Sequence, residues 1–254
     1  MNELKVIILA AGKGTRLRPL TDHIPKVLVQ IGHKTILEHQ LSVLKLLGID
    51  DIHIITGHKS HCIDSKKLTK HHNPDYDNTN MVYSLFRAHE IMDGSSDILI
   101  TYGDIVYTPR VIEEVVACEG DMCLAIDQNW LEYWRMRMNN PLHDAETLKM
   151  DENNKIMEIG LKPKNYDEIQ GQYMGIIKIK GSCVENFKKY FFDLRDGLQN
   201  AAYTNNLYMT EFIQLLINDK WDVRAASVNN GWLEFDRVED LQLIEANFWA
   251  PLEK

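Results

Sequence analysis

The 254-residue chain predicts an α/β fold, a Rossmann-like mixed and mainly parallel sheet flanked by helices. Over residues 1–126, short runs of branched apolar residues alternate with segments of helical periodicity, as in sheets built from strand–helix–strand units. A segment that combines glycine with basic residues, LAAGKGTRLRPLTDHIPK, follows the first apolar run directly. The loop after the first strand of such a sheet commonly binds phosphate groups.

The elements of the first half are predicted from periodicity and turn residues. Lys5 to Leu9 is predicted as a strand because it is short, branched and apolar, and a glycine-bearing turn follows at once. Thr35 to Leu47 is predicted as a helix, since its apolar residues recur near helical spacing and Gly48 can end it. The other predicted strands are Ile52 to Thr56, Ile98 to Tyr102 and Met122 to Ile126, and the other predicted helices are Met81 to Ile91 and Pro109 to Ala117.

The second half shows a different pattern. Three strands are predicted without helices between them, which indicates an antiparallel portion added to the parallel sheet: Leu148 to Met150, Ile156 to Ile159 and Tyr173 to Ile179. Helices are predicted at Val184 to Phe192, Thr210 to Ile217 and Val238 to Phe248, and a strand at Val223 to Val228. Because no repeat or linker separates the halves, we expect one domain over residues 1–254, with parts 1–126 and 127–254.

Composition excludes several classes of protein. The net charge of -9 disfavours sequence-independent nucleic-acid binding, which requires a basic surface. No apolar stretch approaches the roughly 20 residues of a membrane span, and no signal peptide is recognisable, so we expect a cytoplasmic protein without a membrane partner. The four cysteines are scattered without a C-x-x-C pair and are expected to be reduced thiols.

The loop after the first strand is suited to an anion. Small residues allow the backbone N–H groups to approach phosphate oxygens closely, and Arg16 adds a permanently charged planar group. A P-loop is excluded because Gly14 follows Lys13, and a dinucleotide fingerprint is excluded because Leu17 stands where its last glycine belongs. The alternative is an ordinary strand-to-helix turn with surface cations, which the coincidence of two glycines, an arginine and the later Pro25-Lys26 pair disfavours.

The pattern L-A-A-G-x-G-T-R-L-x-P-L-T, followed by P-K, resembles the signature of nucleotidyltransferases that activate sugar phosphates and related compounds. The chain has every fixed position from Leu9 to Thr21. Later segments are most similar to the phosphocholine cytidylyltransferase branch, which includes enzymes that act on phosphonates and phosphoglutamine. These segments are DNTNMVYSL (77–85), YGDIVY (102–107), EIGLKP (158–163), GQYMGIIKI (171–179) and WLEFD (232–236).

This resemblance implies a reaction between two anions. A phosphate or phosphonate oxygen of a small acceptor attacks the α-phosphorus of CTP and pyrophosphate leaves, for cell-surface polysaccharide or phosphonate biosynthesis. Such transfer depends on positioning and electrostatics, and no side-chain nucleophile is needed. Mg2+ is the implied cofactor, CTP and the acceptor are the implied partners, and a homodimer is compatible with the resemblance.

The resemblance also implies roles for five residues. Asp104 follows a predicted strand through Gly103, and Asp236 closes a late apolar run; both match the family's metal ligands, although an aspartate after a strand is often only a turn former. The implied catalytic residues are Arg16 on the triphosphate, Lys26 on the reacting phosphates, Lys162 on the acceptor phosphate, and the two metal ligands Asp104 and Asp236.

The first part of the chain is expected to bind the nucleotide. The residues expected at the base, ribose and phosphates are Leu9, Ala10, Ala11, Gly12, Lys13, Gly14, Thr15, Arg16, Asn73, Thr79, Asn80 and Ser84. Asparagine can donate to and accept from a cytosine edge. Residues 78–80 are also suited to cap a helix, and both interpretations can hold together.

The second part is expected to bind the acceptor. The residues expected there are Lys26, Trp130, Glu158, Lys162 and Tyr173. In DQNWLEYWRMR, two tryptophans lie one helical turn apart among arginines. This arrangement fits an aromatic enclosure for a quaternary ammonium, an arginine site for a carboxylate, or plain packing. Met209-Thr210 resembles a helix cap more than a site.

Two other functions remain open at this point. One is a sugar-1-phosphate nucleotidyltransferase that uses another nucleotide. The other is a nucleotide-sensing module without turnover, which has little need for both carboxylates and both lysines. A dehydrogenase is more distant, because its glycine fingerprint is missing.

Overall fold

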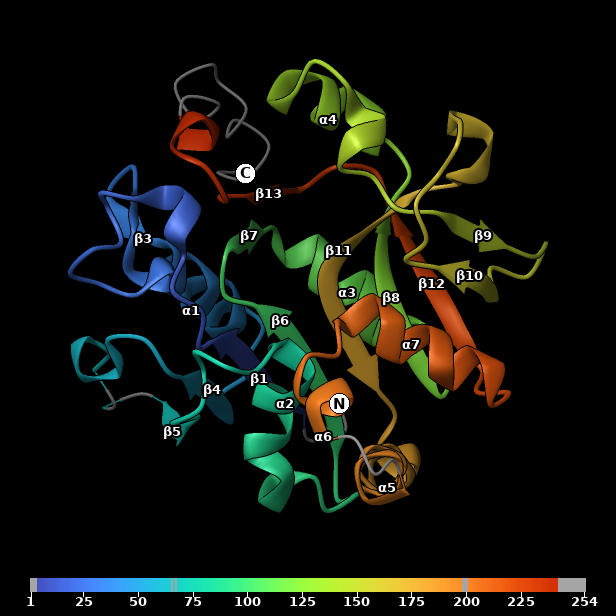
Figure 1. The fold of residues 1–254 in the computed structure, drawn as a ribbon, viewed down its shortest axis with the longest axis horizontal. Coiled ribbons are helices and arrows are strands. Elements are labelled where there is room, and N and C mark those ends of the chain that lie inside the picture. Colours follow the sequence, from blue (N-terminus) through green and yellow to red (C-terminus); the bar gives the residue numbers. More distant parts are fainter. Residues whose placement is uncertain (1–3, 65, 67, 198–200, 242–254) are drawn as a thin grey trace.

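The computed structural model describes residues 4–64, 66, 68–197 and 201–241. Their main sheet has seven strands in the order β12-β8-β11-β6-β1-β4-β5 (Figure 1). All neighbours are parallel except β11, which runs antiparallel to both β6 and β8, so the predicted mixed and mainly parallel sheet is confirmed. The strands are β1 Leu4–Ala10, β4 Ile52–Thr56, β5 Thr69–His72, β6 Asp97–Tyr102, β8 Met122–Asp127, β11 Gln172–Ile179 and β12 Val223–Val228.

Helices cover both faces of this sheet (Figure 1). Successive residues of β1 point to opposite sides: Val6 and Ile8 belong to one buried cluster and Ile7 to the other. This double burial explains why the strands are apolar throughout rather than alternating. One cluster includes residues of α1 Ile36–Leu46, α3 Pro109–Ala117 and α4 Trp130–Arg137, and the other includes residues of α2 Met81–Leu85, α5 Gly181–Gly197 and α7 Met209–Asn218. The short α6 Ala201–Asn205 contacts α2 and α5.

The ends of α1 follow the residues that predicted them. Thr35 is the N-cap: its hydroxyl accepts a hydrogen bond from the Glu38 amide, and the Glu38 carboxylate accepts one from the Thr35 amide. Gly48 lies just beyond the last turn with φ +71°, the left-handed conformation that glycine adopts without strain. The small antiparallel pair β2 Gln30–Ile31 and β3 Lys34–Thr35 precedes this helix.

Three features differ from the sequence prediction. The helix predicted at 81–91 is α-helical only to Leu85, continues as a 3-10 helix over Phe86–Ile91, and has non-helical backbone angles at Ala88. The strands β9 Leu148–Met150 and β10 Ile156–Ile159 pair with each other, so only β11 adds an antiparallel strand to the main sheet. Of the last predicted helix, residues 238–241 form a 3-10 turn, and 242–248 lie outside the described residues.

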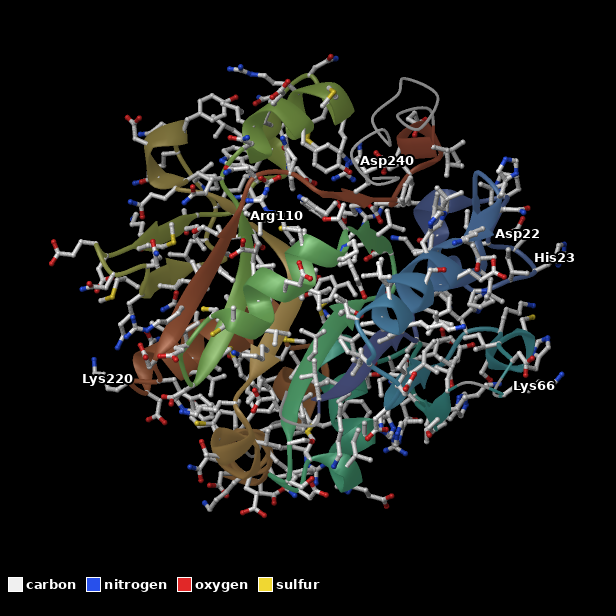
Figure 2. All side chains as sticks on the ribbon, turned by 180° about the vertical axis from the view of Figure 1, so that it is seen from behind. Asp22, His23, Lys66, Arg110, Lys220 and Asp240 are labelled. Carbon is white, nitrogen blue, oxygen red and sulfur yellow. The ribbon has the colours of Figure 1, made fainter. Side chains whose placement is uncertain are left out.

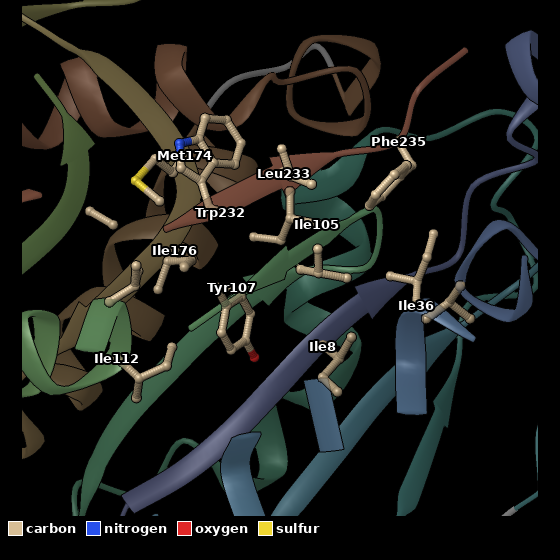
Figure 3. Packing of buried hydrophobic residues seen from close by; sticks show 14 of the residues in the cluster. Ile8, Ile36, Ile105, Tyr107, Ile112, Met174, Ile176, Trp232, Leu233 and Phe235 are labelled. Atoms are coloured by element: carbon tan, nitrogen blue, oxygen red, sulfur yellow. The ribbon is translucent and has the colours of Figure 1, made fainter. Parts of the chain in front are cut away.

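A two-stranded sheet that the sequence did not predict joins the two halves. β13 Trp232–Glu234 runs antiparallel to β7 Ile105–Tyr107, with Leu233 opposite Val106. In Figure 3 the side chains of Leu233 and Ile105 lie near each other in the core below β13. The pairing continues one step further, where the Phe235 amide donates to the Asp104 carbonyl at 2.9 Å. Asp104 and Asp236 therefore lie next to each other at one edge of the main sheet.

Among the described residues, no helix has the length and apolar character that a membrane span requires.

Candidate active site

The loop after β1 folds back on itself. Gly14 has φ +60°, and a Cβ built there lies 3.0 Å from the Lys26 Cβ, so a side chain at this position is both strained and crowded. The Thr21 hydroxyl donates to the Gly14 carbonyl at 2.8 Å and fixes the fold of the loop. A Cβ on Gly12, by contrast, meets nothing within 4 Å. Gly12 faces open space, where a ligand could approach its backbone.

The carboxyl end of β6 lies next to this loop. The Gly103 amide donates to the Leu9 carbonyl at 2.9 Å, and a Cβ on Gly103 lies 2.6 Å from that oxygen, so only glycine fits. Gln40 of α1 donates to the carbonyls of Tyr102 and Ile105 at 2.8 and 2.7 Å. These contacts fix the turn that carries Asp104, because both ends of the turn are bonded to a single buried side chain.

Four charged side chains meet at this edge of the sheet. The Lys26 ammonium donates to Asp104 Oδ2 and to Asp236 Oδ1, each at 2.8 Å. The Arg16 guanidinium lies 2.5 Å from Asp236 Oδ2. Burial by itself lowers the pKa of Lys26, but the two carboxylates outweigh that effect and raise its pKa above the ordinary value. The second Asp104 oxygen, Oδ1, is buried and has no hydrogen-bond partner.

A buried network within residues 127–254 positions Asp236. The Asp236 amide donates to Asp240 Oδ2 at 2.8 Å; Asp240 is labelled in Figure 2. Arg137 of α4 bonds Asp240 through Nε at 3.0 Å and Glu234 through Nη1 at 2.5 Å. Its side chain is only 5% exposed. Burial lowers the pKa of Arg137, but Glu234 and Asp240 outweigh this and raise it, so the guanidinium stays charged. Arg137, one of the arginines of the segment considered for an acceptor carboxylate, is paired with the protein's own carboxylates in this structure.

A cavity of about 280 Å³ lies over the loop and the charged cluster. We call it the first cavity; its lining comprises Leu9, Ala10, Ala11, Gly12, Gly14, Thr15, Arg16, Lys26, Val27, Tyr76, Thr79, Asn80, Met81, Ser84, Tyr102, Gly103, Asp104 and Asp236. Ten of the twelve residues expected at the nucleotide are in this set. Asn80 also caps α2, since its side chain accepts from the Met81 amide at 2.8 Å, so both of its suggested roles are compatible with the geometry.

Two residues expected at the nucleotide do not line the cavity. The Lys13 ammonium pairs with Asp77 at 2.6 Å instead. Asn73 is fully buried and donates to the hydroxyls of Thr79 and Ser84 at 3.0 and 2.9 Å. Its amide therefore orients two cavity residues from behind rather than facing a ligand. The segment does lie at the cavity, and burial decides which of its polar side chains is accessible.

Several cavity residues were missed in the sequence. Tyr102 is the last residue of β6, and its position at the carboxyl end of a strand was the available signal. Met81 directly follows the capping asparagine and was counted only as a helix residue. Tyr76 had no local signal, since it lies in an irregular segment between β5 and α2.

A second cavity of about 220 Å³ adjoins the first and shares Met81 and Tyr102 with it. The lining of this second cavity comprises Met81, Tyr102, Ile105, Trp134, Asp144, Glu146, Gln172, Tyr173, Met174, Gly175, Tyr208, Met209, Thr210, Trp232 and Glu234. Tyr173, expected at the acceptor, is among them. Tyr208 is the N-cap position of α7 without a side-chain cap, so Met209 and Thr210 contribute to a cavity rather than to a helix cap.

Three residues expected at the acceptor lie elsewhere. Trp130 is 4% exposed and packs edge-on against Trp134 with ring centroids 5.8 Å apart, so it belongs to the core. The Glu158 carboxylate pairs with Lys149 at 2.8 Å on the β9–β10 hairpin. Lys162 is exposed and donates to the His143 carbonyl at 2.6 Å, beside the second cavity but outside its lining. Of the five residues expected at the acceptor, Lys26 and Tyr173 line the two cavities and these three do not.

Taken together, the parallel sheet and the charged first cavity at its carboxyl edge define the class: the chain is a nucleotidyltransferase. Residues 6–153 match the family model of the MobA-like NTP transferase domain, and the chain belongs to that family.

Known proteins similar to the chain agree with this class. It is 35% identical over 250 residues to CTP:phosphoglutamine cytidylyltransferase of Campylobacter jejuni, covering 94% of this chain and 98% of that one. A shorter match, 43% over 96 residues, is to choline-phosphate cytidylyltransferase of Streptococcus pneumoniae, with 36% and 42% covered.

Solved structures share the fold. CTP:phosphocholine cytidylyltransferase from Streptococcus pneumoniae superposes with a TM-score of 0.74 at 24% identity, over 96% of this chain and 99% of that one. The inositol-1-phosphate CTP transferase from T. maritima gives 0.75 at 17% identity, over 96% of each chain.

Proposed function

We propose that the protein is a Mg2+-dependent cytidylyltransferase. It transfers CMP from CTP to a small phosphorylated or phosphonylated acceptor, with phosphocholine-like compounds, phosphoglutamine and aminoalkylphosphonates as candidates, and releases pyrophosphate. The observation that carries the proposal is the meeting of Lys26, Asp104 and Asp236 beside a glycine-bearing loop. The names of the two cytidylyltransferase relatives support CTP as the nucleotide. We place the reaction in the cytoplasm, within cell-surface polysaccharide or phosphonate biosynthesis.

The two aspartates fit a magnesium ion. Mg2+ prefers oxygen ligands and commonly takes one or two carboxylates together with phosphate oxygens and water. Asp104 Oδ1 is a buried carboxylate oxygen without a hydrogen-bond partner, which is costly unless a cation or donor satisfies it. We propose that Asp104 and Asp236 hold the ion. When bound, Mg2+ supplies positive charge that offsets the charge of the triphosphate.

The chain's own residues supply positioning and charge. The backbone of residues 9–12 and the Arg16 guanidinium hold the nucleotide and its phosphates at the rim of the sheet. Lys26 keeps its proton because two carboxylates flank it, so a fixed positive charge faces the reacting phosphates. The acceptor oxygen displaces pyrophosphate directly at the α-phosphorus, and no side chain forms a covalent bond. Lys162, beside the second cavity, is proposed to contact the acceptor phosphate as the acceptor enters.

The nucleotide preference is tested by turnover. The protein is incubated with Mg2+, an acceptor panel of phosphocholine, phosphoglutamine, aminoethylphosphonate and glucose 1-phosphate, and one of CTP, UTP, GTP or dTTP, while pyrophosphate release is measured. CTP is expected to give the highest kcat/KM. Faster turnover with another nucleotide and a sugar phosphate would favour a sugar-1-phosphate nucleotidyltransferase. CTP binding without turnover of any acceptor would favour a nucleotide-sensing module.

A further inference from the structure

The charged residues of the second cavity are all acidic, whereas the first cavity balances Arg16 and Lys26 against Asp104 and Asp236. The lining of the second cavity carries three carboxylates and, among the described residues, no lysine, arginine or histidine. Glu234 is already paired with Arg137 at 2.5 Å, which leaves Asp144 and Glu146 to set the charge. A carboxylate of an incoming molecule would be repelled here, and a cation would be attracted.

Glu146 is held in place by its backbone. Its amide donates to the Gln172 side-chain oxygen at 3.2 Å, and the Gln172 side-chain nitrogen donates to the Glu146 carbonyl at 2.7 Å. Gln172 is itself buried, so this pair of bonds fixes the segment against β11. The Glu146 carboxylate accepts one long hydrogen bond, at 3.4 Å, from the Thr210 hydroxyl. Within the described part of the chain it forms no ion pair, which leaves a half-buried charge that a ligand cation would compensate.

A second observation points to a ligand in the same place. The hydroxyl of Tyr173 is buried against the second cavity, which Tyr173 lines, and it forms no hydrogen bond of regular geometry. The ring packs edge-on against Tyr102, with centroids 5.8 Å apart, and the two hydroxyls are near enough to interact, although not in a regular hydrogen bond. A buried hydroxyl without a partner is unfavourable, and a polar group entering the cavity would satisfy it.

Two aromatic rings of α4 face the protein's own arginine, while Tyr102, Tyr173, Tyr208 and Trp232 also line the cavity. The Arg137 guanidinium lies over the rings of Tyr133 and Trp134, 5.3 and 5.6 Å from their centroids. The Trp134 indole also donates to Asp144 Oδ2 at 3.0 Å. A cation entering the cavity therefore meets carboxylate oxygens, while the protein's own arginine already covers those ring faces.

From these contacts we propose that the second cavity binds a primary ammonium group of the acceptor, with the Glu146 carboxylate as the main partner of that group. A primary ammonium can donate up to three hydrogen bonds to carboxylates, whereas a trimethylammonium donates none. The inference rests on the proposed function, since it takes the molecule in the second cavity to be the acceptor whose phosphate lies in the first.

Calorimetry can test this without turnover. The protein is saturated with Mg2+ and a non-hydrolysable CTP analogue and then titrated with O-phosphoethanolamine, phosphocholine and ethyl phosphate. These probes share a phosphate and differ at the other end. Phosphoethanolamine is expected to bind about tenfold more tightly than either of the others, the value of one charge-assisted hydrogen bond. Glu146→Gln should reduce that preference about tenfold, and the exposed Glu152→Gln should leave it unchanged.

The outcomes separate the two proposals. If the CTP analogue itself fails to bind the wild-type protein, the proposed function is wrong. If the analogue binds but phosphoethanolamine binds no better than ethyl phosphate, or does not bind, only the ammonium site is wrong. Phosphocholine binding as tightly as phosphoethanolamine would also overturn the preference for a primary ammonium. If Glu146→Gln does not fold, the affinities of the three probes for the wild-type protein still test whether the second cavity binds a primary ammonium group.

Discussion

The two cavities lie side by side and share two residues, yet they are built in different ways. The first is formed mainly by the ends of adjacent parallel strands, the loop after β1 and the segment that leads into α2, and its charged residues are Arg16, Lys26, Asp104 and Asp236. The second is formed by segments far apart in the chain, among them β11, β13 and the start of α7, and its charged residues are all carboxylates. The contrast teaches that a charge-balanced cluster and a cavity with only acidic charged residues can lie next to each other at one sheet edge.

The largest expected effect lies where the two regions meet, at Arg137. Arg137→Ala removes the cation that holds Glu234 and Asp240, and leaves the buried Asp240 and the partly exposed Glu234 without this ion pair. We expect the free energy of unfolding to fall by about 3–5 kcal/mol, measured by urea denaturation. The exposed neighbour Arg135→Ala on the same helix should change it by less than about 0.5 kcal/mol. If both substitutions lowered the free energy of unfolding by the same small amount, the ion pairs of Arg137 would not stabilise the region between the two cavities.

The next effect tests the charge of the first cavity. Asp104→Asn keeps the shape of the side chain and removes one carboxylate, so kcat is expected to fall by about 10²–10³ with little change in thermal stability. Steady-state pyrophosphate release with Mg2+ measures it. The exposed Asp219→Asn, outside both cavities, serves as the matched control. Wild-type turnover in Asp104→Asn would contradict the metal role proposed for this residue.

A smaller effect tests the backbone of the first cavity independently of its charged side chains. A Cβ at Gly12 meets no atom within 4 Å, so Gly12→Ala should fold normally but place a methyl where a phosphate approaches. We expect CTP to bind about tenfold more weakly by calorimetry, equal to about 1.4 kcal/mol. Gly197→Ala, at the end of α5, also meets nothing within 4 Å and should leave CTP binding unchanged. Unaltered affinity in Gly12→Ala would show that the ligand does not contact this part of the loop.

The smallest effect concerns pH and the second cavity. Burial raises the pKa of Glu146 and Asp144 adds to this, while Thr210 and Lys162 partly offset it. The group therefore protonates at a higher pH than an ordinary glutamate, and its negative charge is lost as pH falls through that raised value. The ratio of phosphoethanolamine to ethyl phosphate affinity should decline a few-fold on acidification, once each affinity is corrected for the separately measured phosphate titration of that probe.

The raised pKa of Glu146 also makes the free energy of unfolding depend on pH. Because the folded protein binds this proton more tightly than the unfolded chain, Glu146 favours folding below its ordinary pKa of 4.5, and this contribution declines as pH rises through the raised value. Glu146→Gln should remove the pH dependence of the affinity ratio. A ratio that stays constant with pH in the wild-type protein would count against Glu146 as the partner of the ammonium group.

The sequence predicted the first region well and the second poorly, for a physical reason. Residues 9–16 form one loop whose backbone lines the cavity, so their positions follow from the strand that precedes them. Trp130, by contrast, was judged from its neighbours on one helix turn, and packing against Trp134 placed it in the core. Glu146 and Thr210 had no local pattern, because their role depends on facing each other across two separate segments.

The sequence by itself determined the strand–helix order, the capped ends of α1 and the phosphate-type loop, since these depend on contacts between residues close in the chain. Tertiary structure decided that β13 pairs with β7, which joins Asp236 to Asp104 and Lys26. It also decided the charge of the second cavity, because Arg137 pairs with Glu234, while Glu146 forms no ion pair within the described residues. Which charges remain free depends on burial and on partners distant in the chain, and local patterns do not encode either.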